Sequence, residues 1–146
     1  MTIRLTKEFS FEMAHLLEGY DGQCCNIHGH SYRLFVTISG APNSNPDSPK
    51  YGMVMDFIEL KRIVKAHIVD KLEHTLMLRK GSKMGETLKA TQTKIVSVDY
   101  QPTCENIVAH MAEILSCELP KNVRLHSIKL YETAASFAEW YADDNK

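Results

Sequence analysis

Two thiols and two imidazoles lie within seven residues of this chain, in the stretch from Cys24 to His30 that reads CCNIHGH. Histidines spaced two apart point to the same side of an extended strand. Neutral imidazoles and thiolates are the usual ligands of zinc in proteins. The stretch therefore indicates either a closed structural zinc site or an open site that performs chemistry.

A third histidine is expected to join the pair. Residues 4–15 alternate between polar and apolar, which predicts a half-buried strand whose apolar face ends in His15. Residues 30–38 alternate in the same way, and His28 and His30 share the parity of their apolar face. If the two strands pair antiparallel, the three imidazoles converge. Three histidines are a ligand set of catalytic zinc, so we predict that they bind one Zn²⁺ per chain.

The two cysteines differ in parity. Cys24 shares the parity of His28 and His30, whereas Cys25 does not. Cys24 is thus either a fourth ligand of a closed site or a thiol beside an open coordination position, where a nearby cation would lower its pKa and make it a competent base. The residues alone leave both roles open. We expect Cys25 to be buried and outside the site.

The elements that position these residues follow the order β-β-α-β-α-β. After the two strands, the sequence predicts a helix from the N-cap Asp56 to about Leu72, a strand over 94–100, a helix over 102–119 and a strand over 123–131. Residues 79–92 are polar and are expected to form a flexible excursion. We predict one α+β domain over residues 1–146, with a four-stranded antiparallel sheet and two helices on one face. Its exposed sheet edges favour oligomerisation.

Composition excludes several classes of protein. The 146 residues include 17 basic and 18 acidic ones, with no basic run interleaved with aromatics, so a nucleic-acid partner is not expected. No apolar run approaches the roughly 18–20 residues that span a bilayer, so a membrane partner is not expected either. Four irregularly spaced cysteines do not form a disulfide framework. We therefore expect a cytoplasmic protein with reduced thiols.

Several motifs, in order, resemble those of the 6-pyruvoyl-tetrahydropterin synthase superfamily, and they cover nearly the whole chain. They are FSFEMAH at 9–15, C-x-x-x-H-G-H-x-Y at 24–32, GMVMDFIELK at 52–61, LEHTLML at 72–78, PTCEN at 102–106 and YET at 131–133. The three residues between Cys24 and His28 look like the bacterial branch that forms 6-carboxytetrahydropterin in queuosine biosynthesis. The resemblance implies the tunnelling fold and a homohexamer of two stacked trimers, with active sites between subunits.

The resemblance also implies roles for single residues, beginning with the three histidines as zinc ligands. Cys24 becomes the catalytic thiol and His74 its partner in proton transfer. Glu132 is expected to anchor the guanidine-like edge of a pterin, with Thr103 and Glu105 lining the same pocket. Without the resemblance, Glu132 would be interpreted as an exposed strand-end carboxylate, and Glu105 as a stabilising charge in the first turn of a helix.

The chain departs from the family pattern beside His74. The family has aspartate before this histidine, whereas this chain has Glu73, and apolar residues replace the asparagine that usually follows. A carboxylate there orients the imidazole and stabilises its cation. Asp70, four residues earlier, would lie on the same face if the helix continued, so either carboxylate is a candidate.

The resemblance predicts a zinc-dependent lyase that converts 7,8-dihydroneopterin triphosphate to 6-carboxy-5,6,7,8-tetrahydropterin, releasing acetaldehyde and triphosphate. The alternatives are the pyruvoyl-forming reaction, which eliminates triphosphate only, an aldolase-like activity on dihydroneopterin, and a non-catalytic, zinc-stapled domain that binds a pterin. Few basic residues lie near the motifs. Lys61, Arg62 and Lys89 are candidates for phosphate binding, and a neighbouring subunit is another source.

Overall fold

The computed structural model describes residues 1–91 and 93–146, and a long hairpin forms its centre. Strands β1 (Ile3–His15) and β2 (His28–Gly40) pair antiparallel over their full length, so that Ile3 lies opposite Gly40 and His15 opposite His28. Alternation sends one row of side chains into the core, as predicted from the sequence. Phe11, Tyr32 and Leu34 are almost completely buried in this row.

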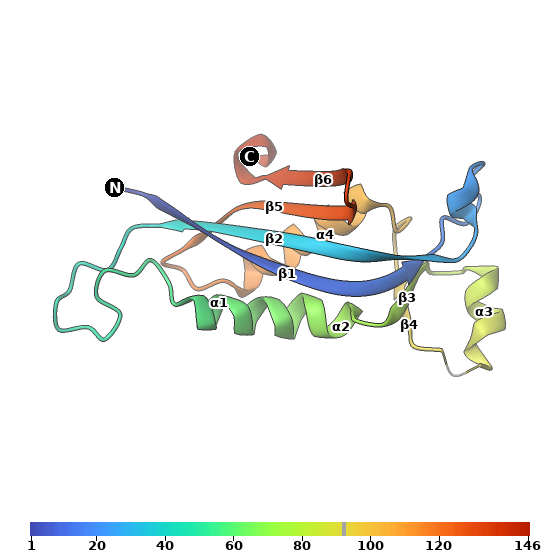
Figure 1. The fold of residues 1–146 in the computed structure, drawn as a ribbon, viewed down its shortest axis with the longest axis horizontal. Coiled ribbons are helices and arrows are strands. Elements are labelled where there is room, and N and C mark those ends of the chain that lie inside the picture. The colour runs from blue at the N-terminus through green and yellow to red at the C-terminus, as the bar shows by residue number, and fades with distance from the viewer. Residues whose placement is uncertain (92) are drawn as a thin grey trace.

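Four further strands flank the hairpin and make a mixed sheet of six (Figure 1). On one side β5 (Arg124–Thr133) pairs antiparallel with β2, and β6 (Ser136–Tyr141) pairs antiparallel with β5. On the other side β3 (Thr75–Arg79) runs parallel to the end of β1, and β4 (Ile95–Val98) runs parallel to β3.

The prediction of four antiparallel strands is therefore wrong in number and partly in direction. Strand β3 is a short apolar run, buried on both sides, and such a run has no alternation that would distinguish a strand from a helix. Strand β6 forms by pairing with the free edge of β5. The alternation of residues within β6 itself gives no sign of this pairing, so the sequence did not predict the strand. Strands β1, β2, β5 and β6 are the ones that pair antiparallel with their neighbours in this order, and they form the larger part of the sheet.

Two long helical segments cover one face of the sheet, as predicted. Helix α1 (Phe57–Val64) begins at Asp56, whose side chain accepts a hydrogen bond from the Ile58 N–H at 2.8 Å. It continues through a π-helical turn (Lys65–Val69) into the short α2 (Asp70–Leu72). Helix α4 (Cys104–Glu118) is capped by Thr103. Both segments contribute side chains to the same hydrophobic core as the sheet.

The polar excursion over residues 79–92 contains a third helix, α3 (Lys83–Lys89), so the expectation of a flexible segment is wrong for the described part of the excursion. Gln92, the last residue of the excursion, lies outside the described residues. Ser82 caps this helix by accepting a hydrogen bond from the Gly85 N–H at 3.2 Å. Leu88 holds it in place against a small apolar cluster made by Leu16, Leu76 and Leu78. Within the described residues, the helices are all too short or too polar to cross a membrane.

Candidate metal centre and active site

Three imidazoles meet where the β1–β2 hairpin closes. His15 and His28 are direct partners across the two strands, and His30 follows two residues later on the same face of β2. The three nitrogen atoms that could bind a metal all lie within 4.8 Å of one another. His15 is only 1% exposed, and its Nε2 lies 3.0 Å from Nε2 of His28. The predicted convergence of the three histidines is confirmed.

Backbone carbonyls determine which ring nitrogens carry the protons. His15 donates from Nδ1 to the Pro102 carbonyl at 2.8 Å, and His28 donates from Nδ1 to the Asn26 carbonyl at 2.7 Å. A carbonyl oxygen only accepts, so in the neutral rings both Nε2 atoms carry lone pairs. Two lone pairs facing each other at 3.0 Å repel unless a cation lies between them. Nε2 of His30 is also buried, with no hydrogen-bond partner among the described residues. The three residues therefore fit a metal ion.

Burial keeps two of the three imidazoles neutral, which is the form that binds a metal. Desolvation lowers the pKa of His15 and of His30 below the ordinary value of 6.5, although the nearby carboxylate of Glu132 acts in the opposite direction. The two rings are therefore neutral at pH 7. Metal binding requires neutral imidazoles, so these two ligands do not have to lose protons at that pH before they bind an ion.

A carboxylate from β5 lies beside the cluster. Oε1 of Glu132 is 3.4 Å from Nε2 of His15 and 3.6 Å from Nε2 of His30. Tyr32 lies next to it, fully buried, with its ring edge-on to His30 at a centroid distance of 5.6 Å. Burial and the charge of Glu132 raise the pKa of Tyr32, so its hydroxyl stays protonated. The motif contains Tyr32, but the sequence did not predict its position beside the cluster.

One cavity connects the cluster to most of the predicted pocket residues. This metal cavity has a volume of about 280 Å³, and its lining includes His15 together with the side chains predicted to bind or transform a pterin, namely Cys24, Thr103, Glu105 and Glu132. Cys24 is half-buried and does not belong to the group of converging ligand atoms, which consists of the three histidines. Cys25 is exposed, so the expectation that it would be buried is wrong.

A second thiol lines the metal cavity, and the sequence did not single it out. Cys104 is the first residue of α4, and its Sγ donates a hydrogen bond to the Leu130 carbonyl at 3.4 Å. Burial, reinforced by the charge of Glu132, raises the pKa of this thiol to about 11. Cys104 therefore stays protonated at neutral pH, which leaves Cys24 as the thiol in this cavity that is suited to proton transfer.

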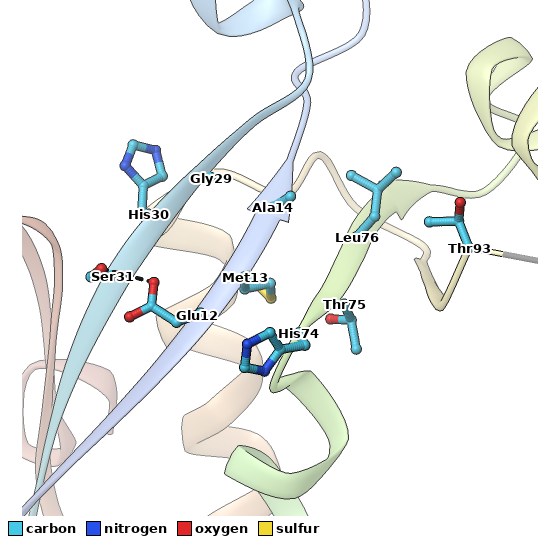
Figure 2. Close-up of a pocket in the computed structure, with 10 residues that line it drawn as sticks. All are labelled: Glu12, Met13, Ala14, Gly29, His30, Ser31, His74, Thr75, Leu76 and Thr93. Carbon is cyan, nitrogen blue, oxygen red and sulfur yellow. Dashed lines mark hydrogen bonds between the residues drawn. The ribbon is translucent and has the colours of Figure 1, made fainter.

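His74 lies in a different cavity, the histidine pocket, of about 420 Å³ (Figure 2). It is 79% exposed, and its backbone is left-handed, with φ at 56°. Two contacts hold it there. Its backbone N–H donates to the Glu12 carbonyl at 2.7 Å, and its Nδ1 lies 2.7 Å from Oε1 of Glu73. The same Oε1 accepts a hydrogen bond from the Glu12 N–H at 3.2 Å, so Glu73 orients the ring.

Asp70 does not support His74 in this structure. The helical segment ends at Leu72, and the chain then enters the left-handed turn, so residues four apart no longer share a face. The carboxylate of Asp70 instead forms an ion pair with Lys65, with 3.3 Å between Oδ1 and Nζ. Of the two candidate carboxylates, the one that contacts the imidazole is Glu73.

The two cavities open in different places, and their described lining residues do not overlap. The histidine pocket includes Glu12 and Ser31, which form a hydrogen bond of 2.8 Å on the face of the sheet that the helices leave open. The metal cavity includes His15, whose parity is that of the buried row. The structure thus brings Cys24 into one cavity with the metal ligand His15 and places His74 in the other, which is also lined by the metal ligand His30.

The fold and the histidine cluster define a class of pterin enzymes. The model of the 6-pyruvoyl tetrahydropterin synthase family matches residues 4–143, and the chain belongs to this family. A Haemophilus influenzae protein named 6-carboxy-5,6,7,8-tetrahydropterin synthase is 38% identical over 141 residues, covering 94% of this chain and 97% of its own length. A Rickettsia felis protein of the same name is 32% identical over 141 residues, covering 94% of this chain and 99% of its own length.

Solved structures confirm the tunnelling fold. The 6-pyruvoyl tetrahydropterin synthase of Caenorhabditis elegans superposes with a TM-score of 0.69 at 24% identity, over 97% of this chain and 96% of its own. The enzyme of Plasmodium falciparum gives 0.70 at 20% identity, over 96% and 98%. The α+β class expected from the sequence is therefore correct, although the strand number is not.

Proposed function

We propose that this chain is a zinc-dependent lyase that converts 7,8-dihydroneopterin triphosphate and one water molecule to 6-carboxy-5,6,7,8-tetrahydropterin, with release of acetaldehyde and triphosphate. The observation that carries the proposal is the metal cavity, where Cys24 lines the same space as His15, one of the three converging imidazoles, without belonging to their ligand set. An open three-histidine site with a nearby thiol is typical of a catalytic zinc site rather than of a structural one. The names of the curated relatives select the carboxy-forming reaction.

His15, His28 and His30 would hold the zinc ion through their Nε2 atoms. When bound, the ion would supply Lewis-acid polarisation of the substrate's side-chain oxygens. The carbonyls of Pro102 and Asn26 keep two of the rings in the tautomer that ligation requires.

The chain's own proton-transfer groups would be Cys24 and His74. Cys24 would accept a proton from a side-chain carbon of the substrate, since the other thiol in the cavity, Cys104, is kept protonated. His74 would exchange that proton, with Glu73 stabilising the imidazolium through the contact at Nδ1. An acid–base pair of this kind contributes roughly 10²–10⁴-fold in rate.

Cys24 and His74 line different cavities in one chain, so a complete site needs a second copy. We propose that the histidine pocket of one subunit closes over the metal cavity of its neighbour, in a cytoplasmic homohexamer that acts in queuosine biosynthesis. The exposure of His74 supports this arrangement, because a catalytic imidazole gains from exclusion of water.

The positions of the two cavity carboxylates support a different assignment from the one that the motifs imply, in which Glu132 anchors the pterin. A pterin carries its side chain at C6, and the guanidine-like edge lies at the opposite end of the bicyclic ring. If the side chain reaches the imidazoles, the anchor of that edge must lie a ring's width away from them. Glu132 contacts His15 and His30 directly, whereas Glu105 lines the cavity from the first turn of α4. We therefore propose Glu105 as the anchor and Glu132 as a carboxylate beside the reacting side chain.

Incubation of the purified, zinc-loaded protein with 7,8-dihydroneopterin triphosphate tests the proposal. Mass spectrometry should detect 6-carboxy-5,6,7,8-tetrahydropterin, with acetaldehyde and triphosphate in equal amounts. A 6-pyruvoyl product would support the alternative that eliminates triphosphate only. If neither product forms while zinc and pterin both bind, the domain is a zinc-stapled binding module and the lyase proposal fails.

A further inference from the structure

The proposed substrate carries a triphosphate, and the following inference rests on that proposed function. A triphosphate is held by ammonium, guanidinium and hydroxyl donors. The metal cavity is poorly suited to it, because Glu105 and Glu132 are the charged side chains among its described lining residues, apart from the imidazole and thiol groups. Another part of the protein must therefore neutralise the phosphates.

The excursion between β3 and β4 is strongly basic. Residues 79–94 contain five basic residues and one acidic residue. Two of these cations are neutralised locally, since Lys80 pairs with Asp99 at 2.8 Å and Lys89 pairs with Glu86 at 2.7 Å. The other three, which have no ion pair in the described part of the chain, are Arg79, Lys83 and Lys94.

Of these three cations, Lys94 is the one that lies beside Glu73 and His74. Its carbonyl accepts a hydrogen bond from the Leu76 N–H at 2.9 Å, which fixes the backbone next to the histidine pocket. Its Nζ reaches to 3.5 Å from the carbonyl oxygen of Glu73, the residue that orients His74. The ammonium group therefore lies at the rim of the surface that carries His74.

Thr93 adds a hydroxyl at the same place. It lines the histidine pocket, where Figure 2 shows it beyond Leu76, on the side away from Glu12. The pocket thus has the carboxylate of Glu12 at one end and the Thr93 hydroxyl at the other, and the Lys94 ammonium lies at its rim beside the carbonyl of Glu73. An anion that enters the pocket is repelled by the Glu12 carboxylate and attracted to the Lys94 ammonium.

We propose that Thr93 and Lys94 of one subunit bind the triphosphate of a substrate whose pterin ring lies in the metal cavity of the neighbouring subunit. The subunit that supplies His74 then also holds the leaving group. This arrangement separates recognition of the pterin, which uses one chain, from recognition of the triphosphate, which uses the other. Neither Lys61 nor Arg62, on α1, is needed for this contact.

Steady-state kinetics with a matched pair of variants test the site. Lys94→Gln should raise KM for 7,8-dihydroneopterin triphosphate about tenfold, the size expected when a charged hydrogen bond is lost, and Thr93→Val should raise it less. Lys80→Gln, on the same excursion but paired with Asp99, should leave KM unchanged. Binding of unphosphorylated 7,8-dihydroneopterin, followed by its fluorescence, should be the same in all three variants. A loss of affinity for both pterins in Lys94→Gln would show a structural defect and overturn the proposal.

A probe that needs no turnover separates this inference from the proposed function. Inorganic triphosphate is titrated calorimetrically into zinc-loaded protein, and zinc content is measured afterwards. Weaker binding by Lys94→Gln than by Lys80→Gln supports the anion site, even if no pterin product is ever found. If product forms normally and Lys94→Gln matches the wild type in both KM and triphosphate affinity, the anion site is wrong and the lyase stands.

Coexpression of two variants tests whether Lys94 acts across the subunit interface. Cys24→Ala chains supply an intact Lys94, and Lys94→Gln chains supply an intact Cys24. Mixed hexamers should recover about a quarter of the wild-type activity at low substrate, because random assembly gives that share of intact sites. Activity no greater than that of the separate variants would place Lys94 in its own chain's site and overturn the proposal.

Discussion

The metal cavity and the histidine pocket lie near the same end of the β1–β2 hairpin, but they are built in opposite ways. The three metal ligands come from long paired strands, and backbone carbonyls fix the rings of two of them, His15 and His28. The histidine pocket draws its key residue from a left-handed turn and leaves it exposed. The difference teaches that one chain brings together all the ligands of a metal site, whereas in the proposed arrangement a second chain completes the proton-transfer site.

The largest expected effect is on Cys24. Cys24→Ala should lower kcat about 10³-fold, because the proposed base is lost, while zinc content and the circular dichroism spectrum remain those of the wild type. Cys25→Ala, which changes an exposed thiol, is the matched control and should retain activity. If Cys24→Ala loses its zinc or its fold, the thiol is a structural ligand and the metal cavity is a closed staple.

The division between the two cavities is tested by complementation. His74→Ala should lower kcat about 10²-fold, and its mixed oligomers with Cys24→Ala should recover about a quarter of the wild-type activity, since each variant contributes the half that the other lacks. Turnover is measured on coexpressed, doubly tagged protein. Absence of recovery would show that Cys24 and His74 act within one chain, and the proposal that two chains share the site would be wrong.

A pair of variants distinguishes the two carboxylates, Glu73 and Asp70, that were candidates for orienting the His74 imidazole. Glu73→Gln removes the charge 2.7 Å from Nδ1 of His74 and should lower kcat about tenfold, while Asp70→Asn, which removes the partner of Lys65, should leave kcat unchanged. Equal effects of both variants would contradict the assignment of Glu73.

The smallest expected effect concerns the burial of the metal ligands. The pKa values of His15 and His30 are lowered in the folded protein, so the unfolded chain binds more protons as the pH falls below about 6.5. The metal-free protein should therefore keep its free energy of unfolding above pH 6.5 and lose it below, by at most about 1.4 kcal/mol per pH unit for each histidine. Urea titrations with a chelator at pH 7.5, 6.0 and 5.0 measure this slope. His15→Gln should reduce it.

Alternation along β1 and β2 was sufficient to predict that His15, His28 and His30 would meet, because side-chain direction in a strand follows from parity alone. Parity was also used to separate Cys24 from Cys25, but both residues lie in a short 3-10 helix (Gln23–Cys25), where strand alternation does not apply, and Cys25 is exposed. The same kind of argument failed at His74. A residue with positive φ breaks the periodicity on which the link to Asp70 depended, and no turn residue such as glycine announces it.

Strands β3 and β6 were missed for a related reason. The residues of β3 are buried on both sides, so their hydrophobicity contains no period, and β6 is defined by its pairing with β5. The motifs predicted a set of site residues, and the structure divides most of these residues between two cavities. That division depends on tertiary placement, as does the proximity of Glu132 to the imidazoles.

The pairing of His15 with His28 has a consequence for how the chain folds. These residues close the β1–β2 hairpin, and only residues 16–27 lie between them. Closing so short a loop is fast compared with the packing of helices from distant parts of the chain. Because His30 lies in the same hairpin, all three ligands belong to one local folding unit. We expect zinc to speed refolding by holding this hairpin closed while α1 and α4 are still unattached, and a refolding rate independent of zinc would contradict this order of events.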